Sequence, residues 1–344
     1  TLAVIFYSWL VVAYADNLPK YDDLHDAFGF FIEYHKANSW HEKLQSFFHP
    51  NNEHVTLVNH LIYWLQVTIK GELDFRQLVW LGNLIIIATA LLASRLHQTN
   101  QPYLSFIVIV GFLSLSFWDS SFKAMTSLSN QAVIFFALLS LIWAEKNRWG
   151  LAVIAALLCH YSQSNGIFIW PLLLLMCKLS SNHQPKPFWL VGIAAFFSTM
   201  LYIIIIIHYK AITDVSLPEV NQGSIAVVYQ TLLMQPLLAL HACINFIGSA
   251  WLSPEHPWLI TSIGIVLFAL FLMRFNRYEK VLKHQVIFLF LIFLLISMII
   301  IAFTRATAYQ DAHAINTSRY KMYPLLFSLL VISMYLMQLK QRLI

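Results

Sequence analysis

Charged side chains are scarce in this sequence. Asp, Glu, Lys and Arg make up only 11% of its 344 residues, while hydrophobic residues make up 59%. The mean hydropathy is +0.67. A soluble chain of this length needs far more polar surface to coat its core. The composition therefore excludes a soluble globular protein and predicts an all-α fold, a polytopic transmembrane helical bundle.

Cysteine is also rare, and patterns of metal ligands are lacking. All three cysteines lie inside apolar runs, so we expect packing residues rather than a disulfide framework or a metal site. The histidines nearest the N-terminus are spaced 10, 6, 8, 5 and 6 residues apart. Two ligands on one helix face need a step of three or four. No structural zinc site is therefore expected at His25, His35, His41, His49, His54 and His60.

The sequence also lacks a basic patch. Its net charge is +5, but the Lys and Arg residues are scattered singly between apolar runs, without the clustering that nucleic-acid binding requires. We therefore expect no nucleic-acid partner. The scattered bases instead indicate membrane topology.

Long apolar runs are what the sequence has in abundance. A spanning helix needs roughly 20 residues, and ten runs approach this length. We expect these runs to span the membrane as one integral domain, 1–344: 1–15, 78–94, 102–118, 130–144, 149–162, 166–179, 188–208, 257–273, 284–303 and 321–339. Apart from Lys178 and Lys321 near run ends, they contain no Asp, Glu, Lys or Arg.

The charges between the runs predict the orientation. If loop 16–77 faces outward, eleven bases and two acids face the other side, a net charge of +9, and the outer side carries −4. A strongly basic face is typical of the cytoplasm. One more crossing upstream would move the basic RFNRYEKVLKH loop outside. Segments 55–69 and 225–250 are therefore expected to lie along or dip into the outer interface.

The main polar island is the first outer loop, 16–77. Seven of the sixteen carboxylates of the chain lie between residues 16 and 60. Other acids, amides, His and Arg residues fall in later outer loops, among them 304–320, whereas the inner loops are short and plain. Polar side chains gathered on one face of a membrane protein indicate a functional site there.

Three motifs in these outer loops carry a resemblance. They are Asp22-Asp23 followed by FHPNNEH (48–54), then SQSNGIFIWP (162–171), and then a late loop that ends in SRY (318–320). Taken in order, the motifs resemble the GT-C superfamily of membrane glycosyltransferases, and the resemblance covers most of the chain. It implies an acidic pair in a first outer loop flanked by interfacial helices, which is similar to the arrangement expected for 55–69.

The resemblance also implies substrates and a location. The donor would be a polyprenyl-phosphate sugar, the acceptor a lipid or glycan of the cell envelope, and the place the extracytoplasmic face of a bacterial inner membrane. One departure is Val55, where related sequences often have an Arg. Its role would have to be dispensed with or supplied elsewhere, by Lys70, Arg76 or Lys123.

Inverting sugar transfer needs a carboxylate base and donors that hold the leaving phosphate. Asp22 and Asp23 are the candidate catalytic residues; adjacent side chains diverge, so only one is expected to be the base, and we favour Asp22. In a helical loop Asp26 would join them on one side, and we expect it to bind substrate. Helix capping and simple solvation are the structural alternatives for this acidic pair. A divalent cation, Mg or Mn, is the cofactor that Asp22 or Asp23 could hold together with a phosphate.

The remaining candidates are substrate-binding residues. Pro50 and the Asn pair are expected to start a helix with Glu53, followed by His54, in its first turn, where capping is the alternative role. Arg is costly near hydrocarbon and is placed there to meet an anion or to snorkel. Phosphate binding is therefore expected of Lys123, Arg305, Arg319 and Tyr320.

The principal rival is a different class of protein. A lipid-linked oligosaccharide flippase, or another transporter, would use acids and Arg to line a pathway. Such proteins often show internal repeats and charges inside their spans, and neither is found here. A non-catalytic assembly subunit is a third alternative.

Overall fold

The computed structural model describes residues 2–51, 54–96, 102–179, 185–213, 235–251, 255–275, 285–309 and 318–343. It divides into two compact units, each described here by itself. Unit 1 comprises Thr1–Thr89 and Asp119–Ser216, and unit 2 comprises Ala90–Trp118 and Leu217–Ile344.

Unit 1 begins with a long helix, a polar loop made of short elements, and then further long helices. In chain order its elements are α1 (Leu2–Tyr14), η1 (Leu24–Phe28), α2 (Gly29–Lys36), α3 (Trp40–Ser46), β1 (Pro50–Asn51), β2 (His54–Val55), α4 (Leu57–Lys70), α5 (Phe75–Ser94, ending in unit 2), α7 (Trp118–Ser121), α8 (Ala124–Glu145), α9 (Trp149–His160), η3 (Ser164–Phe168), α10 (Ile169–Leu179) and α11 (Pro185–Thr213).

Unit 2 consists of helices that pack side by side. Its elements are α6 (Pro102–Phe112), η2 (Leu115–Phe117), α13 (Pro236–Gly248), α14 (Pro257–Phe275), α16 (Gln285–Tyr309), η5 (Ser318–Tyr320) and α17 (Met322–Leu343). Among the described helices, α6, α11, α13 and α14 begin at a proline. Proline suits this position because the first turn does not need its missing N–H.

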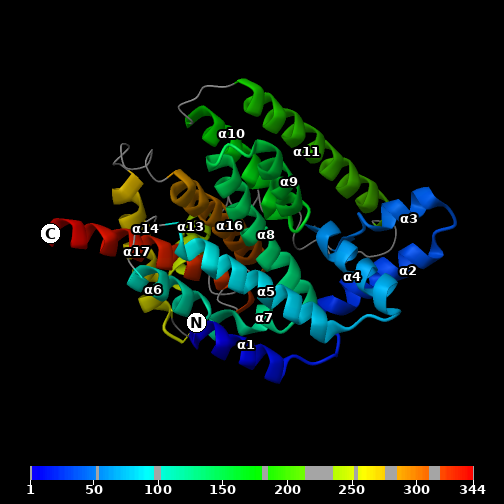
Figure 1. Cartoon of the computed structure of the whole chain (residues 1–344), viewed down its shortest axis with the longest axis horizontal. Helices are drawn as coiled ribbons and strands as arrows, with labels where there is room; N and C mark the ends of the chain where they lie inside the picture. Colours follow the sequence, from blue (N-terminus) through cyan, green and yellow to red (C-terminus); the bar gives the residue numbers. More distant parts are fainter. Residues whose placement is uncertain are drawn as a thin grey trace. The chain divides into compact units, whose positions relative to one another are not determined.

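The predicted helical fold is confirmed, and each of the ten predicted spans overlaps a helix of the described residues (Figure 1). Within the described residues, six helical segments are long and apolar enough to cross a membrane: Phe75–Ser94, Pro102–Ser121, Ala124–Glu145, Pro187–Tyr209, Pro257–Arg274 and Gln285–Arg305. The other predicted spans contain shorter apolar helices, so the count of ten stays a prediction.

Helix α8 is the core of unit 1, and its N-terminal half is buried on all sides. It packs most extensively against α9, where the hydroxyl of Ser140 donates to the carbonyl of Ala152 over 2.8 Å. On α5, Gly82 faces Ser127, and an added Cβ would lie 2.3 Å from the Ser127 hydroxyl oxygen. A larger residue at position 82 would therefore separate the two helices.

In unit 2 the closest approach is between α13 and α14. A Cβ added at Gly248 would lie 1.9 Å from the carbonyl oxygen of Ile260, and one added at Gly264 would lie 1.9 Å from that of Ile244. The two backbones are thus in direct contact, which is how small residues promote helix association in membranes. Helix α13 also packs against α16 and α17.

The semi-apolar segments 55–69 and 225–250 both contain a helix. Helix α4 covers residues 57–69 of the segment 55–69, and it is amphipathic: Tyr63 is fully buried while Leu61, Leu65 and Ile69 are exposed. In 225–250, residues 225–234 lie outside the described residues, and the rest contains α13. Whether either segment lies in the membrane interface stays a prediction.

Candidate functional site

Asp23 attaches the first outer loop to the start of α8. Its carboxylate accepts hydrogen bonds from the backbone N–H groups of Met125 (2.6 Å) and Ala124 (3.3 Å), the first amides of that helix. It also accepts one from the N–H of Lys20 at 3.0 Å. A carboxylate at this position satisfies helix amides that have no partner within the helix, and it complements the helix dipole. Asp23 is therefore a cap supplied by a distant segment.

The environment of Asp23 also changes its acidity. The side chain is 1% exposed. Burial raises its pKa above the usual value, because the charged form loses hydration, and the three backbone N–H groups oppose this rise. The nearby charge of Asp26 adds to the rise.

Asp26 is the centre of a buried polar cluster. It lies in η1, one turn of π-helix, which directs Asp23 and Asp26 inward. Four side chains donate hydrogen bonds to its carboxylate: Thr56 (2.7 Å), Tyr63 (2.8 Å), Asn59 (3.1 Å) and Asn51 (3.4 Å). The carboxylate thus joins η1, β1 and α4, and protein groups occupy both of its oxygens. We place Asp26 behind the site as a supporting residue, instead of in the predicted contact with substrate.

His60 completes this cluster. Its Nδ1 lies 2.8 Å from the carbonyl oxygen of Phe47, which can only accept, so Nδ1 carries a hydrogen. Its Nε2 lies 3.5 Å from Asp26 and 3.3 Å from the Thr56 hydroxyl, whose own hydrogen is donated to Asp26. Burial alone would raise the pKa of Asp26, but the hydrogen bond and charge of His60, with the hydrogen bond from Thr56, hold it below its usual value.

The described residues of the FHPNNEH motif form extended strand rather than a helix start. Pro50 pairs with Val55, and Asn51 with His54, in two short antiparallel strands. The predicted helix start at Pro50 is wrong, because Asp26 bonds to side chains in and next to these strands and the helix begins only at Leu57. The predicted site residue Glu53 lies outside the described residues.

The structure brings the FHPNNEH and SQSNG motifs together. His54 Nδ1 and the Ser164 hydroxyl lie 2.7 Å apart in a hydrogen bond. Gly166 allows the close turn between α9 and η3, since an added Cβ would lie 2.1 Å from the carbonyl oxygen of Cys159. The two motifs therefore belong to one structural unit, although 110 residues separate the bonded pair.

Val55, where an Arg was expected from the resemblance, is part of this packing. It is fully buried against an apolar group formed by Tyr161, Tyr202 and Ile205. A cation at position 55 would need different surroundings. Of the three proposed substitutes, Lys70 and Arg76 are exposed, and Lys70 bonds to Gln77.

Lys123 lies beside the acidic pair. Its ammonium is 2.7 Å from the carboxylate of Asp119 and 4.7 Å from the centre of the Tyr21 ring. Asp22, next to Tyr21, is partly exposed, in contrast to Asp23. In this part of unit 1, Asp22 and Asp119 supply carboxylates, Lys123 a cation and Tyr21 an aromatic ring. The hydrogen bonds from α8 to Asp23 hold the backbone of the loop in place.

The predicted phosphate-binding residues of the late loop gather in unit 2. Arg305 donates a hydrogen bond of 2.6 Å to the hydroxyl of Tyr320. The guanidinium carbons of Arg305 and Arg319 lie 5.4 and 4.9 Å from the centre of the Tyr320 ring. The two positively charged guanidinium groups of Arg305 and Arg319 favour binding of an anion, and the planar donors of a guanidinium match the geometry of a phosphate. Residues 310–317 of the same loop lie outside the described residues.

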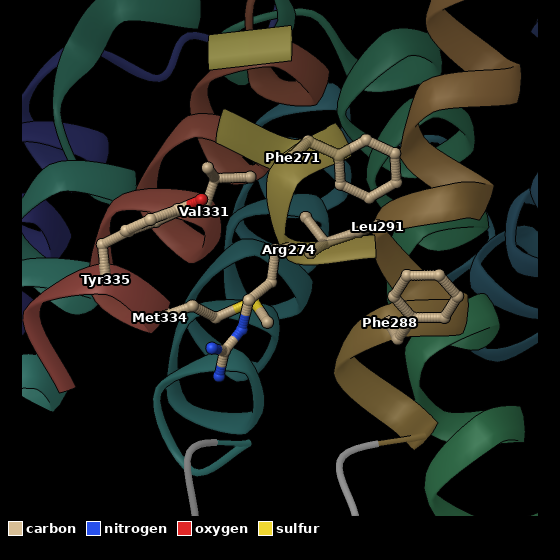
Figure 2. A pocket seen from close by; sticks show the side chains of 7 residues that line it. All are labelled: Phe271, Arg274, Phe288, Leu291, Val331, Met334 and Tyr335. Atoms are coloured by element: carbon tan, nitrogen blue, oxygen red, sulfur yellow. The ribbon is translucent and has the colours of Figure 1, made fainter. Parts of the chain in front are cut away.

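Unit 2 also has a small pocket at the other end of α16 and α17. It is formed by Phe271, Arg274, Phe288, Leu291, Val331, Met334 and Tyr335 (Figure 2). Figure 2 shows the Arg274 guanidinium pointing away from the Phe271 ring. The free volume of about 10 Å³ is near the minimum for one water molecule, so this pocket is a packing feature rather than a substrate site.

The described residues contain no group of three His, Cys, Asp or Glu side chains that could hold a metal ion. Of the nearby carboxylates, those of Asp23 and Asp119 are engaged by backbone amides and by Lys123. A divalent cation at Asp22 would therefore need most of its ligands from water or from a substrate phosphate, which is common for Mg²⁺.

Several residues of this region were missed in the sequence. Asp119 was missed, although it stands at a helical spacing from the predicted residue Lys123 with the opposite charge, a signal that the WDSSFK segment does contain. Asn59, His60 and Tyr63 form the polar inner face of α4, which the pattern of 55–69 could have indicated. No sequence signal distinguishes Tyr21 from other interfacial tyrosines.

Comparison of the chain with known protein families, with curated proteins and with solved structures finds no match.

Proposed function

We propose that this chain is a membrane glycosyltransferase that moves a sugar from a polyprenyl-phosphate donor to a lipid or glycan acceptor on the extracytoplasmic face of a bacterial inner membrane. The observation that carries the proposal is that the two acids of the pair differ in burial and hydrogen bonding. Asp23 is held by the N-terminus of α8, whereas the adjacent Asp22 stays partly exposed. The ring of its other neighbour, Tyr21, lies 4.7 Å from the ammonium of Lys123.

The proposed chemistry assigns one step to each group. Asp22 takes the proton of an acceptor hydroxyl as the oxygen attacks the anomeric carbon of the donor sugar. The bond between that carbon and the phosphate oxygen breaks, and polyprenyl phosphate leaves with the electron pair. Lys123, in the same unit as Asp22, supplies a cation that stabilises the leaving phosphate. The Arg305–Tyr320–Arg319 group of unit 2 is by itself a candidate anion-binding group.

One observation favours the rival transporter class. Gln131 is fully buried in α8, and within the described part of the chain both of its amide atoms lack a hydrogen-bond partner. Unpaired polar groups inside a membrane bundle are costly, and they often mark a pathway. Gln131→Leu separates the two classes, because it should abolish transport but leave sugar transfer within about twofold of wild type.

The decisive experiment is a transfer assay with purified protein. The protein is incubated with radiolabelled polyprenyl-phosphate hexoses and pentoses and with extracts of cell-envelope lipids as acceptors. The proposal predicts a labelled product whose formation is lost in Asp22→Asn. Donor movement between bilayer leaflets without any product would favour the flippase.

A binding assay tests the phosphate group of unit 2 separately. Arg319→Ala should weaken binding of polyprenyl phosphate by about 1.5 to 3 kcal/mol, the range for a hydrogen bond to a charged group. Arg319→Lys should restore only part of this, since Lys lacks the planar fork. Unchanged affinity in the Ala variant would make Arg319 a snorkelling residue.

A further inference from the structure

Tyr21 has an unusual backbone conformation. Its φ is +48°, a region that glycine adopts readily and that is an outlier for a bulky side chain. The neighbouring contacts hold it there: the N–H of Asp23 donates to the Lys20 carbonyl, and the N–H of Leu24 donates to the Tyr21 carbonyl. Because Asp23 is also bound to α8, the loop cannot easily relax.

The Tyr21 side chain lies on the surface of the protein. It is 76% exposed, although it lies beside the half-buried Lys123, whose ammonium is 4.7 Å from the ring centre. Lys123 is itself fixed by Asp119 at 2.7 Å. One ring face is thus taken by a cation, and most of the remaining ring surface stays open.

We propose that Tyr21 is a sugar-stacking residue that determines specificity by holding the pyranose ring of a substrate next to Asp22. Unfavourable backbone conformations persist where neighbouring structure imposes them, and they cluster at functional sites. Aromatic ring faces carry negative charge density, which suits the C–H bonds on one face of a pyranose. The hydroxyl groups around the sugar would meet Asp22, Asp119 and Lys123. This inference rests on the proposed function.

The pyranose could belong to the donor or to the acceptor, and direct titration distinguishes them. Three ligands are used: a polyprenyl-phosphate hexose, polyprenyl phosphate without a sugar, and a methyl hexopyranoside as a free sugar. Binding is measured by saturation-transfer NMR and calorimetry, in a detergent that has no sugar headgroup. If Tyr21 contacts the donor sugar, substitution of Tyr21 weakens binding of the polyprenyl-phosphate hexose alone. If Tyr21 contacts the acceptor, the substitution weakens binding of the methyl hexopyranoside.

The test variant is Tyr21→Asn, because Asn tolerates positive φ but has no aromatic ring. It should weaken binding of one sugar ligand by about 3- to 10-fold, in the range of an aromatic contact, and leave polyprenyl phosphate unchanged. Tyr21→Phe, which keeps the ring, should bind as wild type does. Tyr21→Gly should fold at least as stably as wild type and yet bind sugar as weakly as Tyr21→Asn.

Tyr14 provides the matched control. It is 65% exposed at the end of α1 and packs edge-on against Phe122, as a residue of a membrane-interface belt would. Tyr14→Asn should leave sugar binding unchanged. If Tyr21→Asn also leaves every sugar affinity unchanged, Tyr21 is a belt residue and the inference is overturned. Loss of sugar binding in Tyr21→Asn from a protein that transfers no sugar would support the stacking role and count against the proposed function only.

Discussion

Asp22 and Asp23 are adjacent in the chain but differ in their surroundings. Asp23 is 1% exposed and accepts three backbone hydrogen bonds, whereas Asp22 keeps contact with solvent. A base must reach a substrate hydroxyl, and a cap must stay with its helix. The two side chains are suited to these two tasks.

Asp22→Asn should therefore reduce sugar transfer by about 10²- to 10⁴-fold, the usual contribution of a general base, because Asn cannot accept the proton. The thermal unfolding midpoint should not change. Asp23→Asn should instead lower the unfolding midpoint, because an NH2 group replaces one of the two oxygens that accept backbone N–H groups and leaves a buried donor without its acceptor. Transfer rates and unfolding curves of both variants check this, and an Asp22→Asn variant with wild-type transfer would show that the residue is not the base.

The Asp26 cluster makes the stability of the chain depend on acid. The folded pKa of Asp26 is below its usual value of 3.8. Its contribution to stability is therefore present above pH 3.8 and is lost as the pH falls through the lower, folded value. The unfolding midpoint of wild type should drop with acid in this window.

Asp26→Asn isolates this effect. Removing one partner of a buried ion pair costs about 3 to 5 kcal/mol at neutral pH, so the variant should be clearly less stable than wild type at pH 7. Its midpoint should also depend less on pH below 3.8. Unfolding in detergent from pH 3 to 7 measures both, and parallel curves for variant and wild type would assign the acid sensitivity to other groups.

Individual helices differ in how closely they approach their neighbours. Helices α13 and α14 touch through their backbones at Gly248 and Gly264. In α11, Gly192 has no atom within 4 Å of the position of an added Cβ. These glycines thus form a natural pair of test and control positions.

Gly264→Ala should destabilise the protein by about 1 to 3 kcal/mol, the usual cost of overpacking, because α13 and α14 must move apart. Gly192→Ala should be neutral or stabilising by up to about 1 kcal/mol, since Ala is the better helix former. Denaturation in mixed micelles compares the two. Equal effects would mean that the close approach of α13 and α14 contributes little to stability.

The whole chain is a helical membrane protein with an uneven distribution of charge. The proposed orientation places both ends in the cytoplasm and loop 16–77 outside, since this alone collects a net +9 on the inner side. Six described helices are long and apolar enough to cross a membrane, and shorter apolar helices lie at the other predicted spans. The ten crossings and the orientation are predictions that labelling can test.

Single cysteines test the orientation in intact cells, in a variant whose three native cysteines are replaced by Ala. A cysteine at the exposed Asn38 should react with a membrane-impermeant reagent, and one at Asn276 in the RFNRYEKVLKH loop should react only after permeabilisation. The reverse pattern would invert the topology and place Asp22 in the cytoplasm.

Helix positions could be predicted from local composition. An apolar run in lipid must satisfy its backbone hydrogen bonds internally, so long runs such as 188–208 become helices whatever surrounds them. For the same reason the amphipathic segment 55–69 was recognisable as a helix. The helix start expected at Pro50 was wrong because a distant carboxylate, Asp26, bonds to side chains in and next to the two strands.

The roles of the acids depended on contacts between distant parts of the chain. Asp23 meets the amides of α8 across 101 and 102 residues, and Asp26 meets Tyr63 across 37. Neither partner leaves a periodic signal near the acid, so composition alone cannot separate Asp23 from Asp22. Burial and hydrogen bonding in the folded chain assign Asp23 to anchoring the loop, whereas Asp22 remains partly exposed.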